Sequence, residues 1–320
     1  ASLVNGTWQV TQNSWDCLMV EDAERDQITR IYSLVMVAGN LSALFAPIAA
    51  VLVARLSLVP AVRLLYLNAF VVMSAKIVLL YAASRETAMG AVRRDATRGV
   101  PFATLFAGYR GVLGLVRRSP GTLFALAVAA LAGACSTVNT TFWQVIASQK
   151  LLVPDPLLPF FPMARSLIAI AFYFTLIPAL TSTGTAANLK RPLLLGFGVY
   201  GASQALLALI PAPAGPAAGA RVYVLLGVCL VADGLGAGLL AMLAESLVAL
   251  NVDPVERSRV MAVQRTIVML AVSPFGWIGG LLSGQNRSLP FALTAALLVT
   301  GLIVTLLYHR RPGIGAAVTA

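Results

Sequence analysis

The chain has 320 residues, of which 59% are hydrophobic and only 11% are charged. Soluble globular proteins normally carry about 25% charged residues, so this chain lacks the polar surface that would cover a soluble fold. We therefore predict an integral membrane protein. Its fold class should be all-α and polytopic, because a backbone that crosses lipid must satisfy its hydrogen bonds within each segment.

The charge is strongly positive, with 23 Lys and Arg against 12 Asp and Glu. Such an excess also occurs in nucleic-acid-binding proteins. Here the basic residues lie mainly between apolar segments, so we expect a lipid bilayer as partner and no nucleic acid. Cys17, Cys135 and Cys229 lie far apart in apolar segments. They have neither a disulfide pattern nor metal-ligand spacing, and we expect no cofactor.

Nine runs approach the length of about 20 apolar residues that crosses a hydrocarbon core of about 30 Å. We predict a transmembrane helix for each. They cover roughly residues 2–20, 30–54, 62–83, 122–148, 157–180, 193–210, 222–250, 260–282 and 289–308.

The connections between these spans differ in charge from one side to the other. If the joint that begins at Glu21 faces the cytoplasm, the opposite side holds only Arg55, Arg63, Lys150, Arg221 and Arg287. Most of the remaining basic residues then share the cytoplasmic side. By the positive-inside rule, we expect a multi-pass protein of the cytoplasmic membrane with its carboxyl terminus in the cytoplasm.

The longest connection, residues 84–121, is basic and divides three spans from six. Within it, residues 100–118 mix apolar and basic side chains, as an interfacial amphipathic helix does; a solvated linker fits the same residues. The predicted organisation is a partial amino-terminal bundle of three helices (1–83), a basic cytoplasmic linker (84–121), a carboxyl-terminal six-helix bundle (122–312) and a tail (313–320).

Polar residues mark two faces of the predicted spans. On the first span they recur at helical spacing along one stripe, which is typical either of hydrogen bonds between helices or of one wall of a watery cavity. The number of polar groups favours the cavity. On the fourth span Ser136, Asn139 and Trp143 form a second polar wall. The stripe on the first span consists of Asn5, Trp8, Gln9, Gln12, Trp15 and Asp16.

Charged residues inside the later spans need partners, because each costs about 2.5–3.5 kcal/mol at the bilayer centre. We expect Arg165 and Asp233 to pair across the fifth and seventh helices, either as a structural ion pair or as part of a substrate site. Asp16 and Glu245 each precede a charged joint. For these two carboxylates, proton coupling and a gating role both remain open.

The third, sixth and ninth spans contain few polar residues, chiefly Asn68, Lys76, Ser203 and Gln204. We therefore expect them to be peripheral in the bundle.

With these features the chain resembles the major facilitator superfamily over about its fourth to twelfth helices. The resemblance rests on the paired joints Asp22-Ala23-Glu24-Arg25 and Asp253-Pro254-Val255-Glu256-Arg257, each followed by a helix that contains a proline, Pro47 or Pro274. It rests also on the basic loop and on peripheral helices at every third position. The resemblance implies two six-helix bundles that rock around a central site, with three helices preceding Ala1.

The function that we expect is secondary active transport of a small organic solute across the cytoplasmic membrane, driven by protons. No glycine-rich phosphate loop is present for ATP, and no catalytic motif indicates an enzyme. A non-transporting sensor and a membrane-embedded enzyme on a transporter-like fold remain alternatives.

Tryptophans and amides in the predicted walls favour an uncharged or amphipathic solute over a polyanion. We assign proton coupling or gating to Asp16 and Glu245. Substrate binding is assigned to Asn5, Trp8, Gln9, Gln12, Trp15, Asn139, Trp143, Arg165 and Asp233.

Overall fold

A computed structural model of the chain describes residues 15–16, 18–19, 23–24, 27–84, 87–99, 114, 116–181, 189–215, 218–251 and 257–310. Every regular element within these ranges is helical, and no strand occurs there. The all-α prediction is therefore confirmed for this part of the chain. The long helices are α2 (Ile28–Ala43), α3 (Ala46–Leu56), α4 (Leu58–Ala83), α7 (Pro120–Val145), α8 (Phe160–Thr181), α9 (Lys190–Leu209), α10 (Ala220–Leu250), α11 (Arg257–Gln285) and α12 (Leu289–Arg310).

Eight helical segments in the described part are long and apolar enough to cross a membrane, with α2 and α3 counted as one segment. They correspond to the second to ninth spans predicted above. The predicted first span, 2–20, lies almost entirely outside the described residues, as does most of the predicted amphipathic helix, 100–118. The chain is a multi-pass membrane protein.

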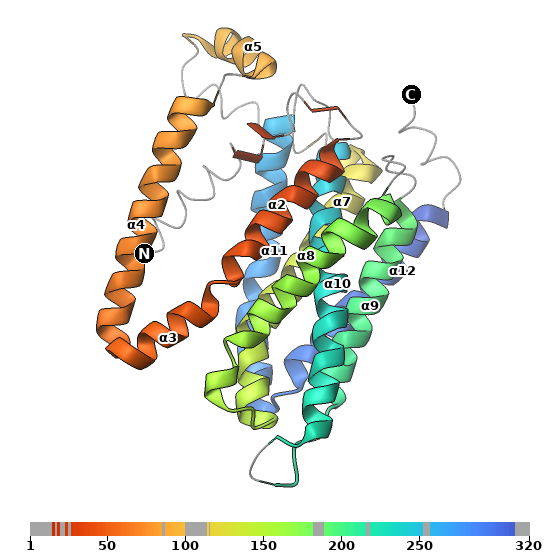
Figure 1. Cartoon of the computed structure of the whole chain (residues 1–320). Coiled ribbons are helices and arrows are strands. Elements are labelled where there is room, and N and C mark those ends of the chain that lie inside the picture. Colours follow the sequence, from red (N-terminus) through yellow and green to blue (C-terminus); the bar gives the residue numbers. More distant parts are fainter. Residues whose placement is uncertain are drawn as a thin grey trace.

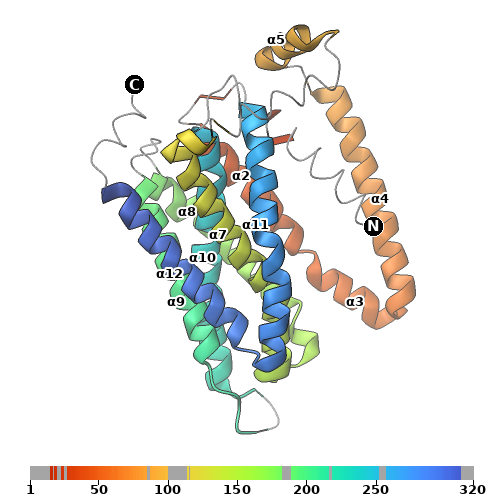
Figure 2. The ribbon, with the colours of Figure 1, turned by 180° about the vertical axis from the view of Figure 1, so that it is seen from behind.

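The bundle is built from α7 to α12, which run up and down beside one another (Figures 1 and 2). In it α9 packs between α10 and α12, and α7 packs against α11 and α12. Helix α2 lies against α8 and α10, so it joins the amino-terminal part to this bundle. Helix α4 packs against α3 and stands apart from the bundle in both views.

The connection that follows α4 contains a short helix, α5 (Ala88–Thr97), whose amino end is capped by the Thr87 hydroxyl oxygen accepting from the Gly90 amide at 2.9 Å. In Figure 1, α5 lies at the same end of the molecule as the carboxyl-terminal end of α12. The loop between α9 and α10 lies at the opposite end. This arrangement follows from helices that alternate in direction.

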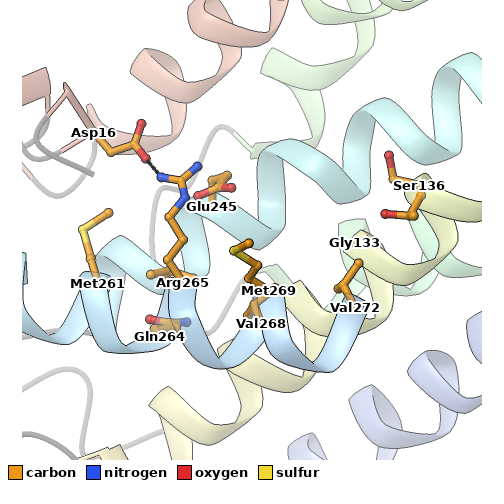
Figure 3. A pocket seen from close by; sticks show the side chains of 13 residues that line it. Asp16, Gly133, Ser136, Glu245, Met261, Gln264, Arg265, Val268, Met269 and Val272 are labelled. Carbon is orange, nitrogen blue, oxygen red and sulfur yellow. Dashed lines mark hydrogen bonds and ion pairs between the residues drawn. The ribbon is translucent and has the colours of Figure 1, made fainter. Parts of the chain in front are cut away.

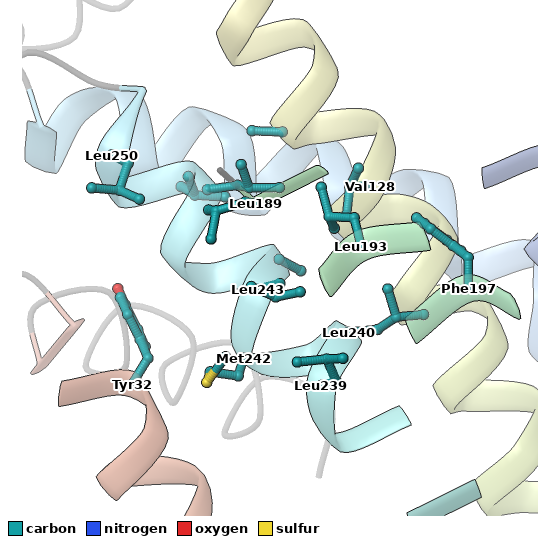
Figure 4. Packing of buried hydrophobic residues seen from close by; sticks show 14 of the residues in the cluster. Tyr32, Val128, Leu189, Leu193, Phe197, Leu239, Leu240, Met242, Leu243 and Leu250 are labelled. Atoms are coloured by element: carbon teal, nitrogen blue, oxygen red, sulfur yellow. The ribbon is translucent and has the colours of Figure 1, made fainter. Parts of the chain in front are cut away.

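The apolar core fills the contacts between these helices. Figure 4 shows Leu193 and Phe197 of α9 facing Leu240 and Leu243 of α10, and all four side chains are buried. Helices α9 and α10 approach closely because α10 has no side chain at Gly236. A Cβ added there would lie 2.6 Å from the backbone nitrogen of Tyr200, and a small residue is required.

The expectation of peripheral helices is confirmed for α4, in which only Ala61 is buried. It is wrong for α9, which packs against α10, α12 and, more lightly, α8. Ser203 and Gln204 of α9 are both fully buried. A helix with few polar residues can thus place those polar side chains against neighbouring helices, while its apolar side chains pack against helices on both sides.

Candidate functional site

A buried ion pair joins α8 to α10. The Arg165 Nε lies 2.9 Å from Asp233 Oδ2, and the Asp233 side chain is only 2% exposed. Both residues lie near the middle of their candidate spans. The predicted pairing of Arg165 with Asp233 is confirmed. A carboxylate at this depth needs such compensation, because removing a charge from water costs several kcal/mol.

Three further helices contribute to the same cluster. The Asn139 Nδ2 on α7 donates to both Asp233 oxygens at 3.2 Å, and the Gln204 Nε2 on α9 donates to Asp233 Oδ1 at 3.0 Å. Thr294 on α12 donates its hydroxyl to Gln204 Oε1 at 3.1 Å. Gln204 and Thr294 were not among the predicted site residues. The available signal was an isolated amide in an apolar helix, which needs a partner in a neighbouring helix.

A cavity of about 340 Å³ lies between α7, α10 and α11 (Figure 3). Its polar end contains an ion pair between Arg265 and Asp16. Glu245 of α10 interacts electrostatically with both of these residues, and Figure 3 shows all three together. The lining residues are Asp16, Ala129, Gly133, Ser136, Thr137, Glu245, Val248, Met261, Gln264, Arg265, Val268, Met269 and Val272.

Helix α11 lines this cavity with one face, because its lining residues recur three or four positions apart from Met261 to Val272. Gln264 lies on that face and is 2% exposed. Neither its Nε2 nor its Oε1 has a hydrogen-bond partner. Gln264 and Arg265 were not among the predicted site residues, although both lie within the predicted span 260–282.

A second cavity of about 330 Å³ lies between α2, α7, α8 and α10. Arg165 and Tyr173 of α8 line it, and the Tyr173 hydroxyl donates to the Gly238 carbonyl at 2.8 Å. The two cavities adjoin, since both are lined by Ala129, Gly133, Ser136, Glu245 and Val268. Glu245 therefore lies on the boundary between the two cavities.

The predicted site residues separate into several groups in the structure. Asn5, Trp8, Gln9 and Gln12 lie outside the described residues. Trp15 is half-buried, and the Lys76 Nζ lies 5.6 Å from the centroid of its ring.

Trp143 differs from the expectation of a cavity wall. It packs against Phe161, with ring centroids 4.8 Å apart, and belongs to an apolar cluster with Ile146 and Leu226. It lines neither of the two cavities. Asn139 likewise contacts Asp233 instead of a cavity, whereas Ser136 of the same helix lines both cavities.

The described residues contain no group of three or more His, Cys, Asp or Glu side chains arranged to hold a metal ion. No family model and no curated protein matches this sequence.

Proposed function

We propose that the chain is a secondary active transporter that moves a small organic solute across the cytoplasmic membrane by alternating access. The observation that carries the proposal is the pair of adjoining cavities within a bundle of membrane-spanning helices. Pockets for small organic ligands commonly have volumes of about 300–1,000 Å³ and combine apolar walls with a few polar groups. Each cavity falls within that range and has both kinds of lining.

The resemblance to the major facilitator superfamily supplies the mechanism of this proposal. In that mechanism two bundles rock around a central solute site. The Asp16–Arg265 ion pair is placed to act as a gate, because it ties the amino-terminal segment to α11 of the other bundle. Its breakage would allow the two parts to separate at that end.

Protons are the proposed coupling ion. Glu245 lines both cavities, and an unneutralised carboxylate within a membrane span is costly. A proton on Glu245 removes that cost when no other cation is present. Movement of this proton with the solute cycle would couple the two fluxes.

The orientation follows from charge. Helix α5, which belongs to the basic connection after α4, lies at the same end as the carboxyl-terminal end of α12 (Figure 1). The positive-inside rule places this end in the cytoplasm.

The test uses the full chain reconstituted in liposomes that contain a pH-sensitive dye. A panel of small uncharged and amphipathic organic solutes is added, and solute uptake and internal pH are followed together. We expect at least one solute to be taken up with a change in internal pH. Glu245→Gln should abolish the coupled pH change and leave the protein in the membrane. Asp155 is an exposed carboxylate outside the cavities, so Asp155→Asn is the control and should leave the coupled pH change unaltered.

Two outcomes would contradict the proposal. Solutes that bind without crossing the membrane would indicate a sensor, and solutes that are converted to products without net flux would indicate an enzyme. Unchanged flux and pH dependence in Glu245→Gln would remove this residue from the coupling step.

A further inference from the structure

The cavity between α7, α10 and α11 carries an uneven charge. Among the described residues that line it, Asp16 and Glu245 are acidic and Arg265 is basic. Arg265 pairs with Asp16 and also interacts with Glu245, so when both carboxyl groups are ionised the three groups together carry one negative charge in excess. In a membrane interior such an excess favours a ligand with a single positive charge.

Gln264 provides an independent indication of a ligand at the same place. Its side-chain amide is buried, lines the cavity and has both a donor and an acceptor without a partner. Each unsatisfied buried polar group destabilises the folded state, and native structures contain few of them. A ligand N–H group in the cavity would bond to Gln264 Oε1, and a ligand acceptor would bond to Nε2.

The rest of the lining defines the other part of such a ligand. The apolar lining includes Met261 on one side of Arg265 and Met269 and Val272 on the other (Figure 3). Val248 of α10 also lines the cavity. Methionine adapts to varied shapes and makes favourable contacts with aromatic rings. A fully hydrated inorganic cation would gain little binding free energy from these apolar side chains. An organic cation with an apolar body would bury that body against them.

We propose that this cavity binds an amphipathic organic ammonium ion as the substrate of the transporter proposed above. The ammonium group binds the Glu245 carboxylate, a second polar group of the ligand bonds to the Gln264 amide, and the apolar body lies against the apolar lining that includes Met269. The Asp16–Arg265 ion pair closes the polar end. The role of this ammonium ion as a substrate rests on the proposed function, whereas its binding is measured without transport.

The test compares three fluorescent probes that share a dansyl group on a five-carbon chain. The first ends in a primary ammonium, the second in its N-acetyl derivative and the third in a carboxylate. Equilibrium binding to the purified full chain in detergent is followed by dansyl fluorescence. We expect the ammonium probe to bind at least tenfold more tightly than the acetylated one, and the carboxylate probe to bind most weakly.

Variants assign the binding to the cavity. Gln264→Leu, close in size, should weaken binding of the ammonium probe about tenfold, which corresponds to about 1.4 kcal/mol. Gln285→Leu, an exposed glutamine at the end of the same helix, is the matched control and should bind as the unaltered chain does. Glu245→Gln should remove the preference for the ammonium probe over the acetylated one.

Thermal unfolding without probe separates this role from a structural one. Because Gln264→Leu removes an unsatisfied buried amide, it should unfold at the same or a higher temperature than the unaltered chain. If this variant does not fold, Gln264→Met replaces it in the binding test.

Equal binding of all three probes, or an unchanged dissociation constant in the Gln264 variant, would overturn the inference. Failure of the proposed function is distinguishable from this outcome. If the chain binds the ammonium probe as described but moves no solute across liposome membranes, the proposed transport function is contradicted and the proposed ammonium site is supported.

Discussion

The Asp233 carboxylate is accommodated inside the bundle by contacts with side chains from three other helices. Arg165 supplies the opposite charge, and Asn139 and Gln204 donate hydrogen bonds. Arg165 of this pair lines the second cavity, and its side chain is 29% exposed. Glu245, at the boundary of the cavities, lies about 18 Å farther along α10 on a rise of about 1.5 Å per residue.

Removing one partner of this pair should be costly. Asp233→Leu leaves Arg165 without its opposite charge, and we expect a loss of about 3–5 kcal/mol in the free energy of unfolding. Combining it with Arg165→Met should restore most of the loss, because both charges are then replaced by apolar groups of similar size. Denaturant unfolding in detergent measures both variants. A double variant no more stable than Asp233→Leu would show that the pairing is not what stabilises the two residues.

At the scale of elements, contact between helices depends on small residues as well as on large ones. The backbone of α10 approaches that of α9 at Gly236, and the buried leucines of both helices pack beside this point. Without a hydrophobic driving force between helices in lipid, such close packing is a main source of association. The same contact positions Gln204 of α9 against Asp233 of α10.

A side chain at this position should separate the two helices. Gly236→Val places atoms against the backbone of Tyr200, and we expect a loss of about 1–3 kcal/mol in the free energy of unfolding from overpacking. Gly227→Val is the matched control on the same helix, because a Cβ there meets nothing within 4 Å. Denaturant unfolding compares the two variants. Equal losses would indicate a general effect of valine on α10 and contradict the packing argument.

At the scale of the whole molecule, alternating helix direction sorts the connections between two ends. Helix α5, the start of α11 and the end of α12 share one end, and the loop between α9 and α10 lies at the other (Figures 1 and 2). The cavities lie between helices that run from one end to the other, which is the placement that the proposed function requires. The proposed orientation adds that the end with α5 faces the cytoplasm.

Labelling with a membrane-impermeant maleimide tests that orientation. In a background with the native cysteines replaced by serine, Ala214→Cys should react from the outside of intact cells and Arg98→Cys only in inverted vesicles. Both positions are exposed. Arg98 directly follows α5 and Ala214 belongs to the loop between α9 and α10, and these two elements lie at opposite ends of the molecule (Figure 1). Reaction of both from the same side would contradict the alternating arrangement, and the reverse pattern would place the carboxyl terminus outside.

The sequence alone determined the membrane class, the positions of eight spans and the Arg165–Asp233 pair. These could be predicted because span length and the cost of a charge in lipid are properties of the segment itself. Asn5, Trp8, Gln9 and Gln12, which carried much of the predicted binding site, lie outside the described residues, and their assignment stays a prediction.

Only the tertiary structure decided which faces of the helices meet. Gln204 was expected on a peripheral helix and instead contacts Asp233, whereas Trp143 was expected on a cavity wall and packs in an apolar cluster. Gln264 became a candidate once its face of α11 was seen to line a cavity. The physical reason is that lipid and the interior of a bundle are similarly apolar. The sequence of an apolar helix therefore gives little indication of which of its faces contacts neighbouring helices.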